Sequence, residues 1–133
     1  MTLPETLKTY IDDHLYTYEY YKQLAENAPD EFSRDMLNDM ANDEMRHAEE
    51  FQVIYQGITG ELYTPTVTTA LQRRTYRDAL GDRVMSESNR YRRYMRNYNN
   101  RGIGDALLLG TLFGAGVDSN LHSLALLYLL SRL

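Results

Sequence analysis

Apolar residues recur at steps of three and four along four long segments of this chain, which is the spacing of one face of an α-helix. No segment shows the strict alternation that is typical of a half-buried strand. Helices are expected over residues 2–27, 29–56, 70–99 and 103–131. The pattern therefore predicts an all-α protein.

The connections between these helices predict how they pair. Two short links, 27–30 and 99–102, join the first helix to the second and the third helix to the fourth. Residues 57–69, which include Gly57, Gly60 and Pro65, form a longer connection. This arrangement favours two helical hairpins joined in one antiparallel four-helix bundle, with residues 1–133 forming a single domain.

Several polar residues interrupt the apolar stripes near the middle of the helices. At 1.5 Å per residue, they lie within roughly 5 Å of the helix midpoints. Antiparallel packing should therefore bring them to one layer inside the bundle. The residues concerned are His14, Glu44, His47, Glu87, Asp118 and His122. In the third helix Val84 is a competing register for Glu87, and in the first helix Glu19 is expected to face solvent.

These residue types are common metal ligands, and a buried polar group needs a partner. Without a cation, a layer of this kind would bury several charged or polar groups at considerable cost. The sequence therefore predicts a transition-metal site. Mixed imidazole and carboxylate ligands are compatible with iron, manganese, zinc or copper and do not choose among them.

Composition narrows the chemistry. The chain has no cysteine, which excludes disulfides, thiolate zinc sites and iron–sulfur clusters. The first residues lack the pattern of a signal peptide and no apolar run is uninterrupted, so we expect a cytoplasmic protein without a membrane span.

Charge is divided unevenly along the chain. Residues 1–65 carry 14 acidic and 4 basic side chains, net −10, and residues 66–133 carry 5 acidic and 10 basic, net +5. We interpret this as two hairpins with complementary outer faces. The arginines of the third helix and the turn after it, Arg90, Arg92, Arg93, Arg96 and Arg101, are expected to be solvated. A nucleic-acid partner is not expected.

Three segments carry a family resemblance: 20–31, which begins Tyr-Tyr-Lys-Gln-Leu, 43–50, which reads Asp-Glu-Met-Arg-His-Ala-Glu-Glu, and 58–60. They resemble the rubrerythrin-like branch of the ferritin-like superfamily. Helices three and four support it only through Glu87-x-x-x-Tyr91, Asp118 and His122. The resemblance implies a carboxylate-bridged di-iron site, with one Glu from each of helices one and three and Glu-x-x-His from each of helices two and four.

Carried over by position, Glu44 and His47 match the motif of the second helix, Glu87 matches the third, and His122 matches the histidine of the fourth. Two carboxylates are missing, because His14 and Ser119 stand at their positions. The remaining set, with Asp118 as an optional ligand, suits one metal better than two. Iron is the expected metal, with manganese or zinc as alternatives.

Two functions follow from this resemblance. The first is a metal-dependent oxidoreductase, of the peroxidase or ferroxidase kind, acting on peroxide, oxygen or ferrous iron at a modified, mononuclear site. The second is a non-enzymatic structural or partner-binding protein with a degenerate metal site, like the spore-coat proteins of this fold. The apolar stretch Leu124–Leu130 also makes a homodimer an expected assembly.

Overall fold

The computed structural model describes residues 1–65, 74–101 and 105–133. These residues form four α-helices and no strand: α1 (Leu3–Glu26), α2 (Glu31–Thr59), α3 (Tyr76–Asn100) and α4 (Ala106–Ser131). The prediction of an all-α, four-helix bundle is confirmed at this level.

Side-chain caps fix the beginnings of the helices. Thr2 and Glu5 form a capping box at the start of α1. Asp30, Thr75 and Asp105 cap α2, α3 and α4 by accepting hydrogen bonds from backbone N–H groups of the first turn.

Two helix ends differ from the prediction. Residues 74 and 75 precede α3, so the predicted helical start at residue 70 was wrong there, because Thr75 is a cap. Residues 70–73 and 103–104 lie outside the described part. α2 ends at Gly60, whose φ of 76° is a left-handed conformation that favours glycine.

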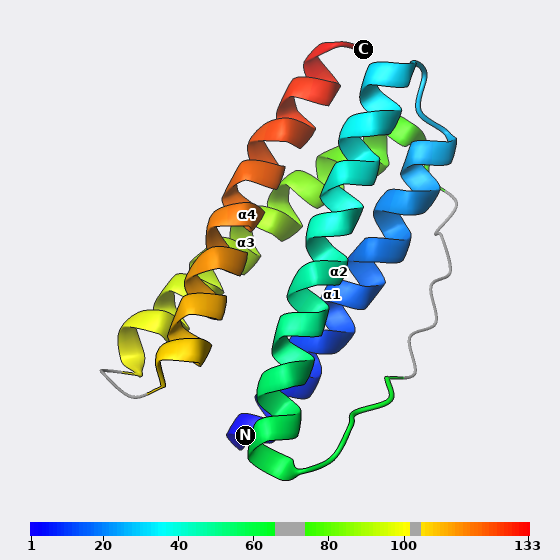
Figure 1. Ribbon diagram of the computed structural model, residues 1–133. Coiled ribbons are helices and arrows are strands. Elements are labelled where there is room, and N and C mark those ends of the chain that lie inside the picture. The colour runs from blue at the N-terminus through cyan, green and yellow to red at the C-terminus, as the bar shows by residue number, and fades with distance from the viewer. Residues whose placement is uncertain (66–73, 102–104) are drawn as a thin grey trace.

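The helices pair as two hairpins (Figure 1). α1 packs along α2 and α3 packs along α4, while α2 and α4 supply the closest backbone approach between the hairpins. The apolar core has two parts. One is centred on Tyr21, Leu37 and Leu126, and the other on Ile11 and Phe51. Polar side chains occupy the layer between them.

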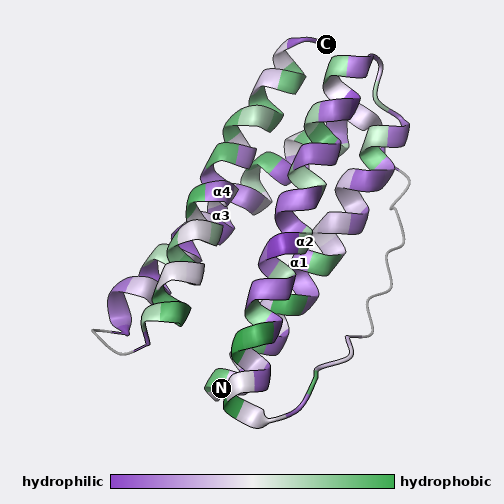
Figure 2. Ribbon diagram, in the orientation of Figure 1, coloured by the Kyte–Doolittle hydropathy of each residue, from purple (hydrophilic) through white to green (hydrophobic). Residues whose placement is uncertain are grey.

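Helix α4 differs from the other three because it is apolar around most of its circumference. Figure 2 shows it green or pale over most of its length, whereas α2 carries hydrophilic residues along much of its visible side. Leu108, Leu112 and Leu126 face the core, but Leu121 and Leu124 of the same helix are exposed. Within the described ranges, no helix combines the length and apolar character that a membrane span requires.

Candidate functional site

Six ionisable side chains fill the middle of the bundle, and none of them exposes more than 7% of its surface. They come from all four helices. We refer to them as the buried charged layer: His14, Glu44, Arg83, Glu87, Arg90 and His122. Two carboxylates are thus buried together with two guanidinium groups, and this pairing decides the chemistry of the site.

Arg90 occupies the centre of the layer. Its Nη1 lies 2.7 and 2.9 Å from the two carboxylate oxygens of Glu44 and 3.1 Å from Oε1 of Glu87. Its Nε donates to Asp13 at 2.9 Å, and its Nη2 donates to Thr17 at 2.9 Å. All three nitrogens of the guanidinium therefore have acceptors, which is the condition for burying such a charge.

Arg83 lies one helical turn from Glu87 on the same face of α3. Its Nη2 donates to Oε1 of Glu87 at 2.9 Å and to the hydroxyl of Thr17 at 3.3 Å. The guanidinium also lies over the rings of Tyr20 and Tyr21, 5.6 Å from each centroid. The second buried carboxylate is therefore matched by a second buried arginine.

The pKa of Glu44 reflects this pairing. Burial alone raises it, but the charge of Arg90 and the neighbouring His14 and His122 hold it well below its usual range. Burial similarly raises the pKa of Asp13, but Arg90 together with His14 and Arg83 lowers it below its usual value. Both carboxyl groups are consequently anionic partners of the guanidinium.

His14 links Glu44 to Tyr94. Its Nδ1 lies 2.5 Å from Oε2 of Glu44 and its Nε2 lies 2.8 Å from the hydroxyl of Tyr94. Burial and the charge of Arg90 lower the pKa of His14, and burial raises that of Tyr94 well above its usual range. A neutral imidazole thus donates from Nδ1 to Glu44 and accepts at Nε2 from Tyr94, so both ring nitrogens are occupied.

His122 has a carboxylate at each ring nitrogen. Its Nδ1 lies 3.0 Å from Oε2 of Glu87, and its Nε2 lies 2.9 Å from Oδ2 of Asp43. Burial lowers the pKa of His122, but hydrogen bonds to Asp43, Glu44 and Glu87 raise it well above its usual range. As an imidazolium, it donates from both nitrogens and has no lone pair for a metal.

His47 and Asp118 form a separate pair at the edge of the layer. Nε2 of His47 lies 2.6 Å from Oδ2 of Asp118, and its Nδ1 lies 2.8 Å from Glu50. Arg46 also donates to Asp118, at 2.8 Å. The structure therefore brings the predicted ligands His47 and Asp118 together across α2 and α4, but each one bonds to the other.

A metal ion has one candidate position among the described residues. Glu44, Glu87 and His122 each offer a ligand atom, and these atoms lie within 4.8 Å of one another, so the group could hold an ion. The same carboxylates already bind Arg90. A divalent cation there would lie beside a buried positive charge that water screens poorly.

The two-iron site implied by the family resemblance does not fit these residues. His14 and Ser119 stand where the resemblance would place two carboxylates, and the hydroxyl of Ser119 lies 3.4 Å from Nη1 of Arg90. The guanidinium thus lies among the positions of the expected ligands. Bridging two dications would require both more negative charge and the removal of Arg90.

A cleft of about 220 Å³ between α1 and α3 leads to the layer. Its walls are polar, and they include Asp13, Arg83, Ser86, Asn89, Arg90 and Arg93. A cation that approached through this opening would meet three arginines. The cleft therefore opposes the entry of a metal ion that the predicted site would need.

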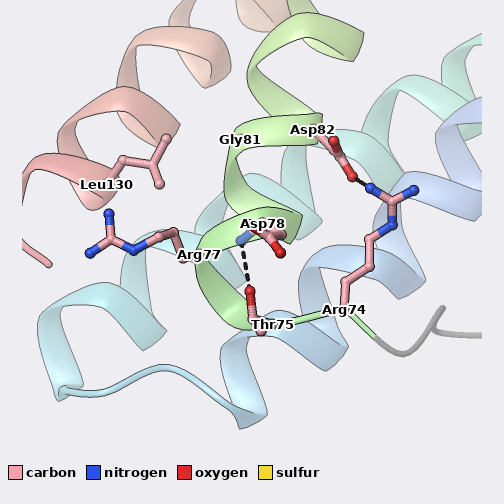
Figure 3. A pocket seen from close by; sticks show the side chains of 7 residues that line it. All are labelled: Arg74, Thr75, Arg77, Asp78, Gly81, Asp82 and Leu130. Carbon is pink, nitrogen blue, oxygen red and sulfur yellow. Dashed lines mark hydrogen bonds and ion pairs between the residues drawn. The ribbon is translucent and has the colours of Figure 1, made fainter.

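A larger cavity of about 590 Å³ lies at the start of α3, away from the layer (Figure 3). Figure 3 shows Arg74 paired with Asp82 on one side, and Arg77 and Leu130 on the other. Thr75, which caps α3, accepts from the N–H of Asp78 at 3.1 Å. None of its lining residues is a histidine or a member of the layer, so we assign no chemistry to it.

The prediction that Arg90 is solvated is wrong. Arg90 was expected in a solvated row with Arg92, Arg93 and Arg96, but only 1% of its surface is exposed, while those three are exposed. The signal that identifies Arg90 is its spacing, because it follows Glu87 by three residues and precedes Tyr94 by four. Glu19 is exposed, as predicted.

We expect the free energy of unfolding to be greatest near pH 6.5, the ordinary pKa of histidine. Folding raises the pKa of His122, so the charged imidazolium stabilises the folded protein. This stabilisation is complete below pH 6.5 and is lost as the pH rises through the raised pKa. Because folding lowers the pKa of His14, stability also falls as the pH drops below 6.5.

Urea unfolding from about pH 5 to about pH 9 tests this prediction. The groups that face His122 are Asp43 and Glu44 of α2, Glu87 of α3 and the ring of Tyr21 of α1. His122→Gln should flatten the alkaline side of the profile, and His14→Gln should flatten the side just below 6.5. A wild-type profile that rises steadily across this range would contradict the assignment.

Comparisons of the chain with protein-family models, with curated proteins and with solved structures find no match. The resemblance to rubrerythrin-like proteins therefore rests on the sequence alone, chiefly on segments 20–31, 43–50 and 58–60.

Proposed function

We propose that this chain is a non-enzymatic, ferritin-like antiparallel helical bundle with a structural or partner-binding role, in which arginine replaces the metal. One observation carries the proposal. Nη1 of Arg90 lies within 3.1 Å of carboxylate oxygens of both Glu44 and Glu87. These are the two family carboxylates that the chain retains, and a guanidinium already balances their charge.

The chemistry of the histidines supports the same function. His14 accepts from Tyr94 at the nitrogen that does not face Glu44, and His122 donates from both nitrogens. A metal ion would have to displace a proton from His122 and to push aside Arg90. Both steps cost free energy that the metal-free layer does not require.

A second function is favoured by the clustering of Glu44, Glu87 and His122. In this alternative the layer rearranges to hold one transition metal, iron first, with manganese or zinc as substitutes. The protein would then be an oxidoreductase acting on peroxide, oxygen or ferrous iron, and the metal would supply the redox chemistry. Glu44 and Glu87 would hold it, and His122 would lose its proton.

Metal content separates the two functions. Protein isolated without chelator should contain well below one transition-metal ion per chain by elemental analysis. Its melting temperature should not change with chelator, because a metal that does not bind the native state cannot stabilise it. Ferrous-ion oxidation and peroxide reduction should not exceed the rates in buffer.

The opposite results would establish the second function. About one ion per chain, a melting temperature that falls with chelator, and loss of both features in His122→Ala would show a metal site. His47→Ala should change neither feature if His47 only pairs with Asp118. Two irons per chain with rapid, repeated turnover would show that the family site is intact in spite of Arg90.

A further inference from the structure

The outer face of α4 is largely apolar, with the exposed Asn120 as a polar residue on it. Six large apolar side chains on this helix expose between 50% and 57% of their area: Leu107, Phe113, Leu121, Leu124, Leu127 and Tyr128. Asp118, the one acidic residue of α4, turns away from this face toward His47 and Arg46. The residues that α4 packs on α3 and α2 lie on its opposite side.

Two glycines on the same face have no role within the chain. A Cβ atom added to Gly110 or Gly114 would meet no atom within 4 Å. By contrast, a Cβ atom at Gly116 would overlap the terminal methyl group of Met95, so that flexible side chain of α3 would have to shift. Because glycine destabilises the interior of a helix relative to alanine, Gly110 and Gly114 indicate close approach by something outside the chain.

The order of small and large residues along the face identifies that partner. Positions three or four residues apart read Leu107, Gly110, Gly114, Val117, Leu121, Leu124 and Tyr128. If an identical helix runs in the opposite direction with Val117 at the two-fold axis, Gly114 faces Leu121 and Gly110 faces Leu124. Leu121 and Leu124 then each meet a glycine, as in the packing of knobs into holes, and Leu107 faces Tyr128.

The exposed area agrees with this pairing. Half-exposed side chains of this size each present roughly 100 Å². Six of them on each copy would bury roughly 1,200 Å² in total, which is the lower end for a stable interface.

We propose that a second copy of this chain covers this face, so that α4 packs against α4 in an antiparallel, two-fold symmetric homodimer. The inference goes beyond the proposed function and does not depend on whether the buried layer binds a metal. It names a partner for a face that the four helices of one chain leave uncovered.

Light scattering during size-exclusion chromatography tests the proposal. Wild-type protein at micromolar concentration should have twice the 15.5 kDa mass of one chain. Leu124→Glu should elute as a folded monomer, because it places a charge in each half of the contact. The matched control is Val53→Glu on α2, at a side chain that is 62% exposed against 57% for Leu124, and it should remain dimeric.

Cross-linking tests the direction of the helices, because the natural chain has no cysteine. Chains with Gly114→Cys, mixed with chains carrying Leu121→Cys, should form a disulfide-linked dimer under mild oxidation, and neither variant should link to itself. Self-linking of each variant would show parallel helices and overturn the register. A monomeric wild type would overturn the dimer, and its co-sedimentation with phosphatidylcholine vesicles would assign the face to a lipid surface.

Discussion

Replacing Arg90 with methionine should lower the free energy of unfolding by about 3–5 kcal/mol, because it removes one partner of a buried ion pair. Glu44 would keep only the neutral His14 and the distal contact with His122 at 3.6 Å. Methionine is long enough to fill part of the vacated space, so the loss reports mainly on charge. Urea unfolding followed by circular dichroism measures it.

The matched control is Arg92→Met, which makes the same change two residues later at an exposed position of α3. It should alter the free energy of unfolding by no more than about 0.5 kcal/mol. If Arg90→Met is too unstable to isolate, Arg90→Met combined with Glu44→Gln should restore folding, because it removes the unpaired charge. Equal stability of Arg90→Met and wild type would show that Arg90 does not lie in the layer.

Local signals in the sequence were sufficient for the helices. Thr2 with Glu5 caps the start of α1, and Gly60 ends α2, although α2 continues to Thr59, beyond the predicted end at residue 56. The start of α3 was missed although its signal was present, since Thr75 precedes Asp78 by three residues and caps the helix. Such helix ends depend on contacts within one turn, so the local sequence predicts them without knowledge of the rest of the fold.

The charged layer could be predicted only in part. The apolar periodicity and the position near each helix midpoint pointed to four residues that the structure brings together: His14, Glu44, Glu87 and His122. Arg90 could not be distinguished by residue type from its exposed neighbours. Three of its acceptors, Asp13, Thr17 and Glu44, belong to α1 and α2. Only the packing of these helices beside α3 brings them within reach of Arg90.

The metal prediction assumed that buried carboxylates and imidazoles required an external cation. The structure supplies the cation from within the chain, because a guanidinium offers five N–H donors in a fixed geometry and stays charged when buried. Two arginines, Arg83 and Arg90, pair with the two carboxylates of Glu87 and Glu44, so the opposite charges are equal in number. Such a layer balances its buried carboxylates without a metal.

If Arg90 is what excludes metal, then its removal together with restoration of the family carboxylates should create a metal site. The triple variant His14→Glu, Arg90→Ala, Ser119→Glu should bind close to two ferrous or manganous ions per chain. Four carboxylates would then line the layer with His122, and bridging oxygens are the ligands that hard dications prefer. At a free-metal concentration of about 100 Kd, binding should stabilise this variant by about 2.7 kcal/mol.

The decisive control keeps the guanidinium. His14→Glu with Ser119→Glu adds the same two carboxylates, but Arg90 lies 3.4 Å from the Ser119 hydroxyl and would pair with the new acid. This double variant should gain little metal, and its melting temperature should respond weakly to added ions. If it instead binds two ions as tightly as the triple variant, the missing carboxylates alone account for the altered site. If neither variant binds metal, then the backbone positions of α1 and α4 have moved too far from the ferritin-like arrangement for side chains to restore it.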